Sequence, residues 1–400
     1  MARTYPFGET VRLDLHPTYA RLQDEEPMSR IRLPYGGRDG QPAEAWLATR
    51  HADVRQVLGD HRFSMALAMD PATPRVEPLP LRPGPLLTMD PPEHTRVRRL
   101  VAKEFTMRRV EKLRPHTEEH VAQFLDEMVA HGKPADLVRH LALPLPITMI
   151  CELLGVPYAE RHRFRSFSDV LTATTAHTPA EINHAWGELE GYLAELVAQR
   201  RAAPTDDLLG ALVLARDEGD RLSEQELVRV GLNLLIAGHE TTASQIGNFS
   251  YTLLSQPELY QRLVAEPALV PTAVEELLRV IPLRSAGSFP RVAKEDIEVG
   301  GVLVRAGEAV LINVGQANRD PRVFADPELR DLAREHNPHL AFGHGVHHCL
   351  GALLARLELQ LVLSALVSRF PGLRLAVPAE EIPWKPGLLA RQPLSLPVTW

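Results

Sequence analysis

The residues best able to do chemistry in this chain are gathered in one short loop that ends at a cysteine. The loop reads Phe342-Gly343-His344-Gly345-Val346-His347-His348-Cys349-Leu350-Gly351. Its two glycines allow backbone conformations in which the chain can approach a flat ligand closely. A helical pattern starts directly after the loop, so we expect Cys349 at a helix N-terminus, where the dipole and free N–H groups stabilise a thiolate. Such a thiolate suits haem iron, because its electron donation favours O–O cleavage.

Two other interpretations of this loop remain open from the residues alone. A lone cysteine is often only a small buried hydrophobe. A metal cluster of His344, His347, His348 and Cys349 is conceivable, but the spacing lacks the paired ligands of zinc sites.

The loop resembles the cysteine-ligand motif of the cytochrome P450 superfamily, Phe-Gly-x-Gly-x-(His/Arg)-x-Cys-x-Gly, at every fixed position. The resemblance implies haem b (iron protoporphyrin IX) as cofactor. It makes Cys349 the iron ligand and puts Phe342, Gly343, His347 and Gly351 among the cofactor-binding residues. The fold it implies is mainly α with small β-sheets (α+β), a triangular helical prism holding the haem between a long central helix and the cysteine-loop helix. The whole chain, 1–400, is then a single domain.

A second motif, Ala237-Gly238-His239-Glu240-Thr241-Thr242, falls midway along a long apolar helix expected over Glu224–Leu254. It resembles the superfamily's (Ala/Gly)-Gly-x-(Asp/Glu)-Thr oxygen-binding motif, and the resemblance puts Ala237 and Gly238 among the cofactor-binding residues. The Thr241 hydroxyl can bond the Ala237 carbonyl one turn back, and Gly238 weakens the helix by roughly 1 kcal/mol relative to alanine. Glu240 and Thr241 supply an acid and a hydroxyl for proton relay. Alone, such a run is more often structural, and His239 is expected to point away and pack.

Four side chains that are cations or hydrogen-bond donors match family positions that contact the haem propionates: His94, Arg98, Arg291 and His347. His94 and Arg98 are four residues apart, so they share one helix face. Taken alone, this pair is more simply a solvated face. Carboxylates bind best to cationic or donor side chains, so the set predicts propionate anchors.

The pair Glu276 and Arg279 matches the family's Glu-x-x-Arg motif, which steadies the loop leading to the cysteine. The third member in the family is an arginine of the downstream meander, which reads here Asp326-Pro327-Glu328-Leu329-Arg330-Asp331. Leucine stands at the expected position, Leu329, so Arg330 is expected to take the role by a register shift.

The sequence pattern predicts that most residues over about 90–280 and 350–370 are helical, and that the regions near both ends of the chain are rich in β-strands. Asp90 with its two following prolines predicts a capped helix start. The alternating pattern of Phe289–Val314, broken by glycines, predicts hairpins. The expected helices are Ala52–Leu58, Glu118–His131, Arg161–Thr172, Ala180–Arg201, Glu224–Leu254 and Leu350–Phe370.

Composition limits the class of protein. The 400 residues are 44% hydrophobic, carry a formal net charge of -7 and include two cysteines. The acidic balance disfavours nucleic-acid binding, and two distant cysteines argue against a disulfide scaffold. The first residues lack a secretory or membrane-spanning pattern, so we expect a cytoplasmic protein that binds no membrane. We also expect a monomer.

The resemblance implies a monooxygenase (EC 1.14 class) that hydroxylates or epoxidises a medium-to-large apolar substrate with O2, in secondary-metabolite (polyketide or macrolide-like) biosynthesis. Coupling or desaturation by the same haem-thiolate group, and a non-catalytic haem or gas-binding module, stay open as alternatives. Electrons are expected from NAD(P)H through a separate ferredoxin reductase and ferredoxin. A basic patch has two interpretations: a docking site for an acidic electron carrier, or a helix face that is only exposed to solvent. The patch consists of Arg96, Arg98, Arg99, Lys103, Arg108, Arg109, Lys112 and Arg114.

Family topology assigns five segments to the substrate pocket. They are mostly apolar, with Arg82 and Arg284 as the obvious charges. The segments are Met65–Leu87, Arg161–His184, Leu234–Ala237, Ile281–Phe289 and Leu388–Leu389.

Overall fold

The fold is taken from a computed structural model of the chain. It describes residues 2–8, 10–37, 43–77, 84–157, 160, 170, 178–217, 222–284, 289–385 and 390–400. The chain divides into two compact units, the first made of Met1–Arg96 and Glu275–Cys349, the second of Val97–Val274 and Leu350–Trp400. Two of the three crossing points fall inside continuous helices rather than in linkers. The single-domain organisation stays a prediction.

The first unit is built on a six-stranded sheet of order β1-β2-β3-β9-β6-β4. A two-stranded hairpin of β7 and β8 turns at Gly300 and Gly301, whose φ angles of 56° and 78° suit glycine. The expected hairpins of Phe289–Val314 are confirmed. The strands are β1 (Arg3–Thr4), β2 (Met28–Arg32), β3 (Glu44–Ala48), β4 (Phe63–Ser64), β6 (Arg291–Ala293), β7 (Ile297–Val299), β8 (Val302–Val304) and β9 (Ala309–Ile312).

Short helices pack around this sheet. Helix α2 carries Val54, Val57 and Leu58 on its buried face, and these residues join the core formed by the strands. The expectation for Ala52–Leu58 is confirmed, whereas the helix at Thr18–Glu25 was not predicted. The helices of this unit are α1 (Thr18–Glu25), α2 (His51–Gly59) and α12 (Val314–Ala317), with short turns η1 (Leu67–Met69) and η6 (Gly345–His347).

The second unit is helical, with one small sheet of order β10-β11-β5. Helices α3 and α11 begin in one unit and end in the other. The elements are α3 (Glu93–Val101), η2 (Ala102–Phe105), α4 (Met107–His131), β5 (Ala135–Asp136), η3 (Val138–Ala142), α5 (Pro144–Leu154), α7 (Pro179–Ala202), α8 (Leu208–Asp217), α9 (Glu224–Ser255), α10 (Pro257–Ala265), η5 (Pro267–Leu269), α11 (Val270–Val280), α13 (Ala352–Arg369), β10 (Arg374–Leu375), η7 (Ala379–Glu381) and β11 (Pro397–Thr399).

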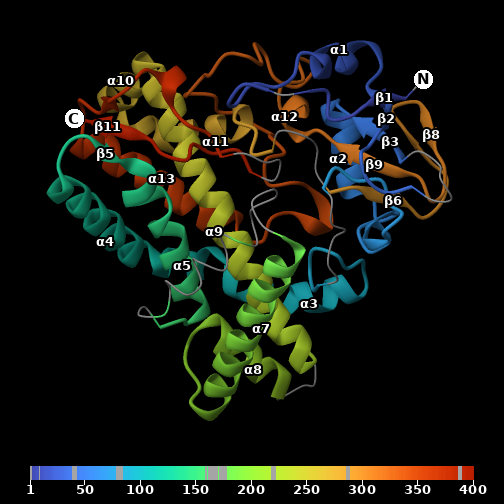
Figure 1. Cartoon of the computed structure of the whole chain (residues 1–400), viewed down its shortest axis with the longest axis horizontal. Coiled ribbons are helices and arrows are strands. Elements are labelled where there is room, and N and C mark those ends of the chain that lie inside the picture. Colours follow the sequence, from blue (N-terminus) through green and yellow to red (C-terminus); the bar gives the residue numbers. More distant parts are fainter. Residues whose placement is uncertain are drawn as a thin grey trace. The chain divides into compact units, whose positions relative to one another are not determined.

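Helix α9 is the central element of the second unit, and α5 and α13 pack against it (Figure 1). It starts at a capping box in which Ser223 and Glu226 satisfy each other's backbone N–H groups. Gly238 is required where α5 crosses, because a Cβ there would lie 2.9 Å from the Cδ1 and Cγ1 atoms of Ile150. The expected long central helix is confirmed.

Most other helix expectations are confirmed, with two corrections. Helix α4 starts at Met107, earlier than the expected Glu118, because Thr106 caps it and Pro115 is accommodated inside it. The expected cap residue Asp90 lies before α3, but its carboxylate instead accepts the backbone N–H of Met65 at 2.9 Å. Residues 161–169 and 171–172 of the expected helix Arg161–Thr172 lie outside the described residues. Within the described residues, no helix is long and apolar enough to cross a membrane.

Candidate functional site

The cysteine loop folds back on itself in the first unit. The N–H of Cys349 donates to the carbonyl of Phe342 at 2.8 Å. Gly343 and Gly345 have φ angles of 73° and 71°, in the region that favours glycine. A Cβ on Gly345 would lie 2.6 Å from the carbonyl oxygen of Leu58, so this glycine also lets the loop pass close to α2. The predicted need for two glycines is confirmed.

The position of Cys349 relative to its helix corrects the expectation. Helix α13 begins at Ala352 with Gly351 as its N-cap, so Cys349 precedes the first helical residue by three positions. His348 has an extended backbone, with ψ of 136°, and this separates the η6 turn from α13. Cys349 is exposed, whereas the other cysteine, Cys151, is buried. The loop therefore leaves Cys349 accessible at the surface of the described structure.

Three of the expected propionate anchors lie in the first unit. The rings of His94 and His347 are in contact, with centroids 4.4 Å apart. Arg291 begins β6 and is 8% exposed, and its side chain makes no hydrogen bond or ion pair to any residue that the structure describes. Burial lowers the pKa of its guanidinium to about 10. Arg98 follows His94 by one turn on α3.

A buried guanidinium without a counter-charge is costly, and an anion that enters its site removes much of that cost. A haem group brings two propionates. The neighbouring imidazoles of His94 and His347, together with the unpaired Arg291, offer the donors that those carboxylates need. The residues present therefore fit haem.

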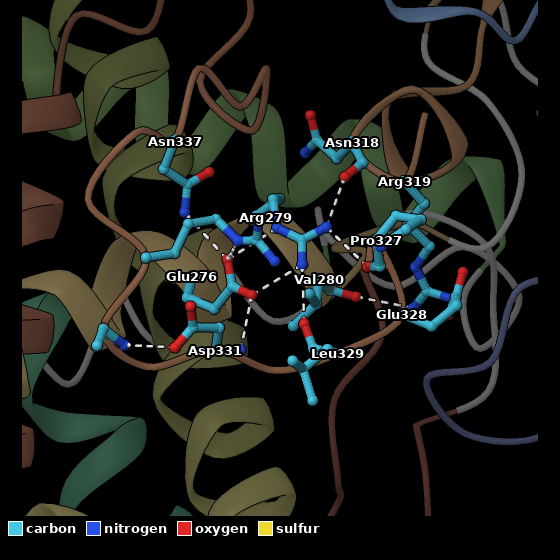
Figure 2. A network of polar contacts seen from close by, with 12 residues as sticks. Glu276, Arg279, Val280, Asn318, Arg319, Pro327, Glu328, Leu329, Asp331 and Asn337 are labelled. Carbon is cyan, nitrogen blue, oxygen red and sulfur yellow. Dashed lines mark hydrogen bonds and ion pairs between the residues drawn. The ribbon is translucent and has the colours of Figure 1, made fainter. Parts of the chain in front are cut away.

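A buried polar network supports the segment that leads to this loop, and Figure 2 shows it. Glu276 and Arg279 are both fully buried and form a two-point ion pair, with both distances 2.8 Å. Arg279 also donates to the carbonyls of Asn318 and Pro327, each at 2.8 Å. These bonds satisfy the guanidinium, which is the condition for a buried charge pair to hold.

The third member of this network is Arg334, which corrects the expectation for Arg330. Nε of Arg334 lies 3.1 Å from Oε2 of Glu276, and Asn337 donates to the same oxygen at 3.1 Å. Leu329 takes part only through its carbonyl, which accepts from Arg279 at 3.1 Å. The meander therefore carries its arginine four residues beyond Arg330.

The second group of candidate residues lies on α9 in the second unit. The Thr241 hydroxyl donates to the Ala237 carbonyl at 2.7 Å, as predicted. Both residues are exposed, although all residues from Thr242 to Leu254 are buried. His239 is completely buried, which confirms that it packs. Gly238 has the packing role described above, and its role in cofactor binding stays a prediction.

Glu240 is held by two residues that the sequence did not predict. Its Oε1 forms an ion pair with Nζ of Lys385 and accepts from Nε2 of Gln392 at 3.2 Å. Glu240 is 5% exposed, and its Oε2 is buried without a hydrogen-bond partner among the described residues. Sequence could not show this contact, because about 145 residues separate the charges.

The basic patch is partly neutralised by local ion pairs. Arg109 pairs with Asp206 at 3.0 Å, and Arg114 pairs with Glu111 at 2.7 Å. Exposed pairs of this kind stabilise little but reduce the field available for steering.

The pocket segments are described only in part. Arg284 lies 3.8 Å from Glu77 and 4.4 Å above the ring of Phe289. Arg82, Leu388, Leu389 and most of 161–184 lie outside the described residues.

Comparison with known proteins gives concordant matches. The family model for cytochrome P450 matches residues 146–394. Nocardicin C N-oxygenase of Nocardia uniformis subsp. tsuyamanensis is 57% identical, over 100% of this chain and 98% of its own. Mycinamicin IV hydroxylase/epoxidase of Micromonospora griseorubida is 50% identical, with coverage of 100% and 98%. The LnmA cytochrome P450 hydroxylase of the leinamycin biosynthetic pathway of Streptomyces atroolivaceus S-140 superposes with a TM-score of 0.93 at 50% identity, covering 100% of both chains.

Proposed function

The chain belongs to the cytochrome P450 family and is a haem-dependent monooxygenase, and from this premise we propose which residues carry the reaction. Cys349 ligates the iron, and His94, Arg98, Arg291 and His347 hold the propionates. The observation that carries this assignment is the loop geometry, in which two glycines of positive φ deliver an exposed cysteine. The buried and unpaired Arg291 supports it independently.

The overall reaction consumes the substrate, O2, a proton and NAD(P)H. It yields the oxygenated substrate, water and NAD(P)⁺. When bound, haem ligated by a thiolate supplies the chemistry of O2 reduction and O–O cleavage. Glu240 takes up and releases protons at Oε2. The Thr241 hydroxyl orients the hydrogen-bonding groups to which these protons pass. The hydroxyl is already anchored by its bond to Ala237 at 2.7 Å.

Electrons come from a separate ferredoxin and its NAD(P)H-dependent reductase. We propose that an acidic ferredoxin docks on the basic patch through complementary charge. The protein acts as a cytoplasmic monomer.

The substrate is a medium-to-large, mostly apolar secondary metabolite. Support comes from the relatives, which include a mycinamicin IV hydroxylase/epoxidase and a leinamycin-pathway hydroxylase. Apolar pocket segments agree with this class. Hydroxylation or epoxidation of a macrolide-like molecule is the favoured reaction.

Oxidation at nitrogen is a second candidate, favoured by the 57% identity with an N-oxygenase. Macrolide-like compounds and amine-bearing compounds should therefore be screened together for a substrate-induced spin-state shift. Turnover with a surrogate ferredoxin and reductase then identifies the product by mass. A product that has gained an oxygen atom supports the proposal. A compound that binds without giving any oxygenated product supports a haem-binding module. A product that has lost two hydrogens indicates coupling or desaturation.

A further inference from the structure

Two described segments near the C-terminus, 383–385 and 391–394, run antiparallel and dock on α9 beside Glu240, and we call this pair of segments the hairpin. The N–H of Lys385 donates to the carbonyl of Gln392 at 2.9 Å, which joins the two arms. The amide of Asn248 donates to the carbonyl of Arg391 at 2.8 Å, and the Ser244 hydroxyl donates to Oε1 of Gln392 at 3.1 Å. One face of α9 therefore fixes the hairpin over a full turn.

Each arm of the hairpin contributes one side chain that contacts the same carboxylate oxygen. Lys385 from the first arm and Gln392 from the second both contact Oε1 of Glu240, and Ser244 in turn orients Gln392. Oε2 of Glu240 has no such partner among the described residues, although it is buried. Because two side chains bind Oε1, the carboxylate of Glu240 is held in one orientation, in which Oε2 is left without a hydrogen-bond partner among the described residues.

We propose that Lys385 and Gln392 are positioning residues that clamp Oε1 of Glu240, so that Oε2 alone carries protons toward Thr241. This inference rests on the proposed function, because it concerns the proton supply of that reaction. The proton leaves Oε2 as a proton only, and Glu240 regains one from solvent, so no electrons move in this step. Without the clamp, the carboxylate turns and protons arrive too slowly. Reducing equivalents are then lost as peroxide.

The test compares Lys385→Met with Lys385→Arg and Asn248→Ala in the purified holoenzyme. Lys385→Met should lower the product formed per NAD(P)H at least five-fold and reduce kcat, with KM changed less than two-fold. Lys385→Arg keeps the cation and should restore at least half of that coupling. Asn248→Ala weakens the same hairpin at a point that does not touch Glu240, so its coupling should stay within two-fold of wild type.

A second readout does not depend on turnover. Urea midpoints of Lys385→Met, Glu240→Gln and the double variant should be non-additive, with the double variant shifted less than the sum of the single shifts. Additive shifts, or wild-type coupling in Lys385→Met, overturn the proposal. So does an equal loss in Asn248→Ala, which would show that hairpin docking alone matters. Failure of the proposed function differs, because the wild type would then form no product while the midpoints still report the clamp.

Discussion

Nε of Arg334 lies 3.1 Å from Oε2 of Glu276, although 58 residues separate them in the chain. The Glu276 carboxylate is fully buried and also binds Arg279, and the exposed fraction of the Arg334 side chain is only 12%. The contact therefore ties the meander to α11 through a charge that water does not reach.

Arg334→Ala should lower the free energy of unfolding by about 3–5 kcal/mol, because it removes one partner of a buried charge network. Arg330→Ala is the matched control and should lower it by less than about 1 kcal/mol, within the range of ordinary substitutions outside such networks. Urea unfolding of both variants decides between them. A larger loss in Arg330→Ala would return the third role to Arg330.

This contact marks a limit of sequence reasoning. The pair Glu276 and Arg279 could be predicted, because three residues of helix place both side chains on one face. The meander has no such period, so nothing in its spacing says which of two nearby arginines reaches the carboxylate. The partner of Asp90 was likewise not predictable from spacing, because its carboxylate accepts the backbone N–H of Met65 instead of capping α3.

Gly345→Ala should disrupt the cysteine loop more than Gly301→Ala does. Both positions have positive φ, 71° and 78°, so both variants carry similar backbone strain. Gly345 has a neighbour in the way, since its added Cβ would lie 2.6 Å from the carbonyl oxygen of Leu58. At Gly301 no atom of the described residues would lie within 4 Å of the added Cβ. Haem content and melting temperature measure the difference. Equal losses in the two variants would mean that φ strain alone requires the glycine.

Arg291→Leu should weaken haem retention by roughly 10-fold or more, since a hydrogen bond to a charged group contributes about 1.5–3 kcal/mol. Transfer of haem to an excess of apomyoglobin measures the loss. Lys294→Leu, at an exposed position three residues on, should leave retention unchanged. Unaltered retention in Arg291→Leu would remove Arg291 from the propionate set.

Glu358 gives the protein a pH-dependent stability. Burial in α13 raises the pKa of its carboxyl from 4.5 to about 8, and Oε2 has no hydrogen-bond partner among the described residues. Between these two values the folded state holds a proton that the unfolded state has lost. The free energy of unfolding therefore falls by about 1.4 kcal/mol per pH unit as pH rises through this window.

Glu358→Gln removes this titration. It should be as stable as wild type near pH 4.5 and more stable by several kcal/mol at pH 8, in proportion to the slope above. Glu195→Gln, an exposed acid on α7, serves as control and should follow the wild-type profile. Parallel urea profiles for wild type and Glu358→Gln would show that Glu358 is ionised throughout.

The candidate site was predictable where its functional residues lie close together in the sequence. The cysteine loop and the Ala237–Thr241 motif are short, and their internal geometry follows from glycine φ angles and from helix spacing. The partners of Glu240 were not predictable, because Lys385 and Gln392 reach it only through the docking of a distant hairpin. The position of Cys349 was missed by three residues, since an extended His348 delays the start of α13.

The most direct test of the account is the carbon monoxide difference spectrum of the reduced protein. Wild type and Cys151→Ser, a variant at the buried cysteine of α5, should both show the strongly red-shifted band of thiolate ligation. Cys349→Ser should lose this band while keeping the far-ultraviolet spectrum of a folded protein. A red-shifted band that survives in Cys349→Ser, or an imidazole-type band in the wild type, would contradict the assignment of Cys349 as the iron ligand.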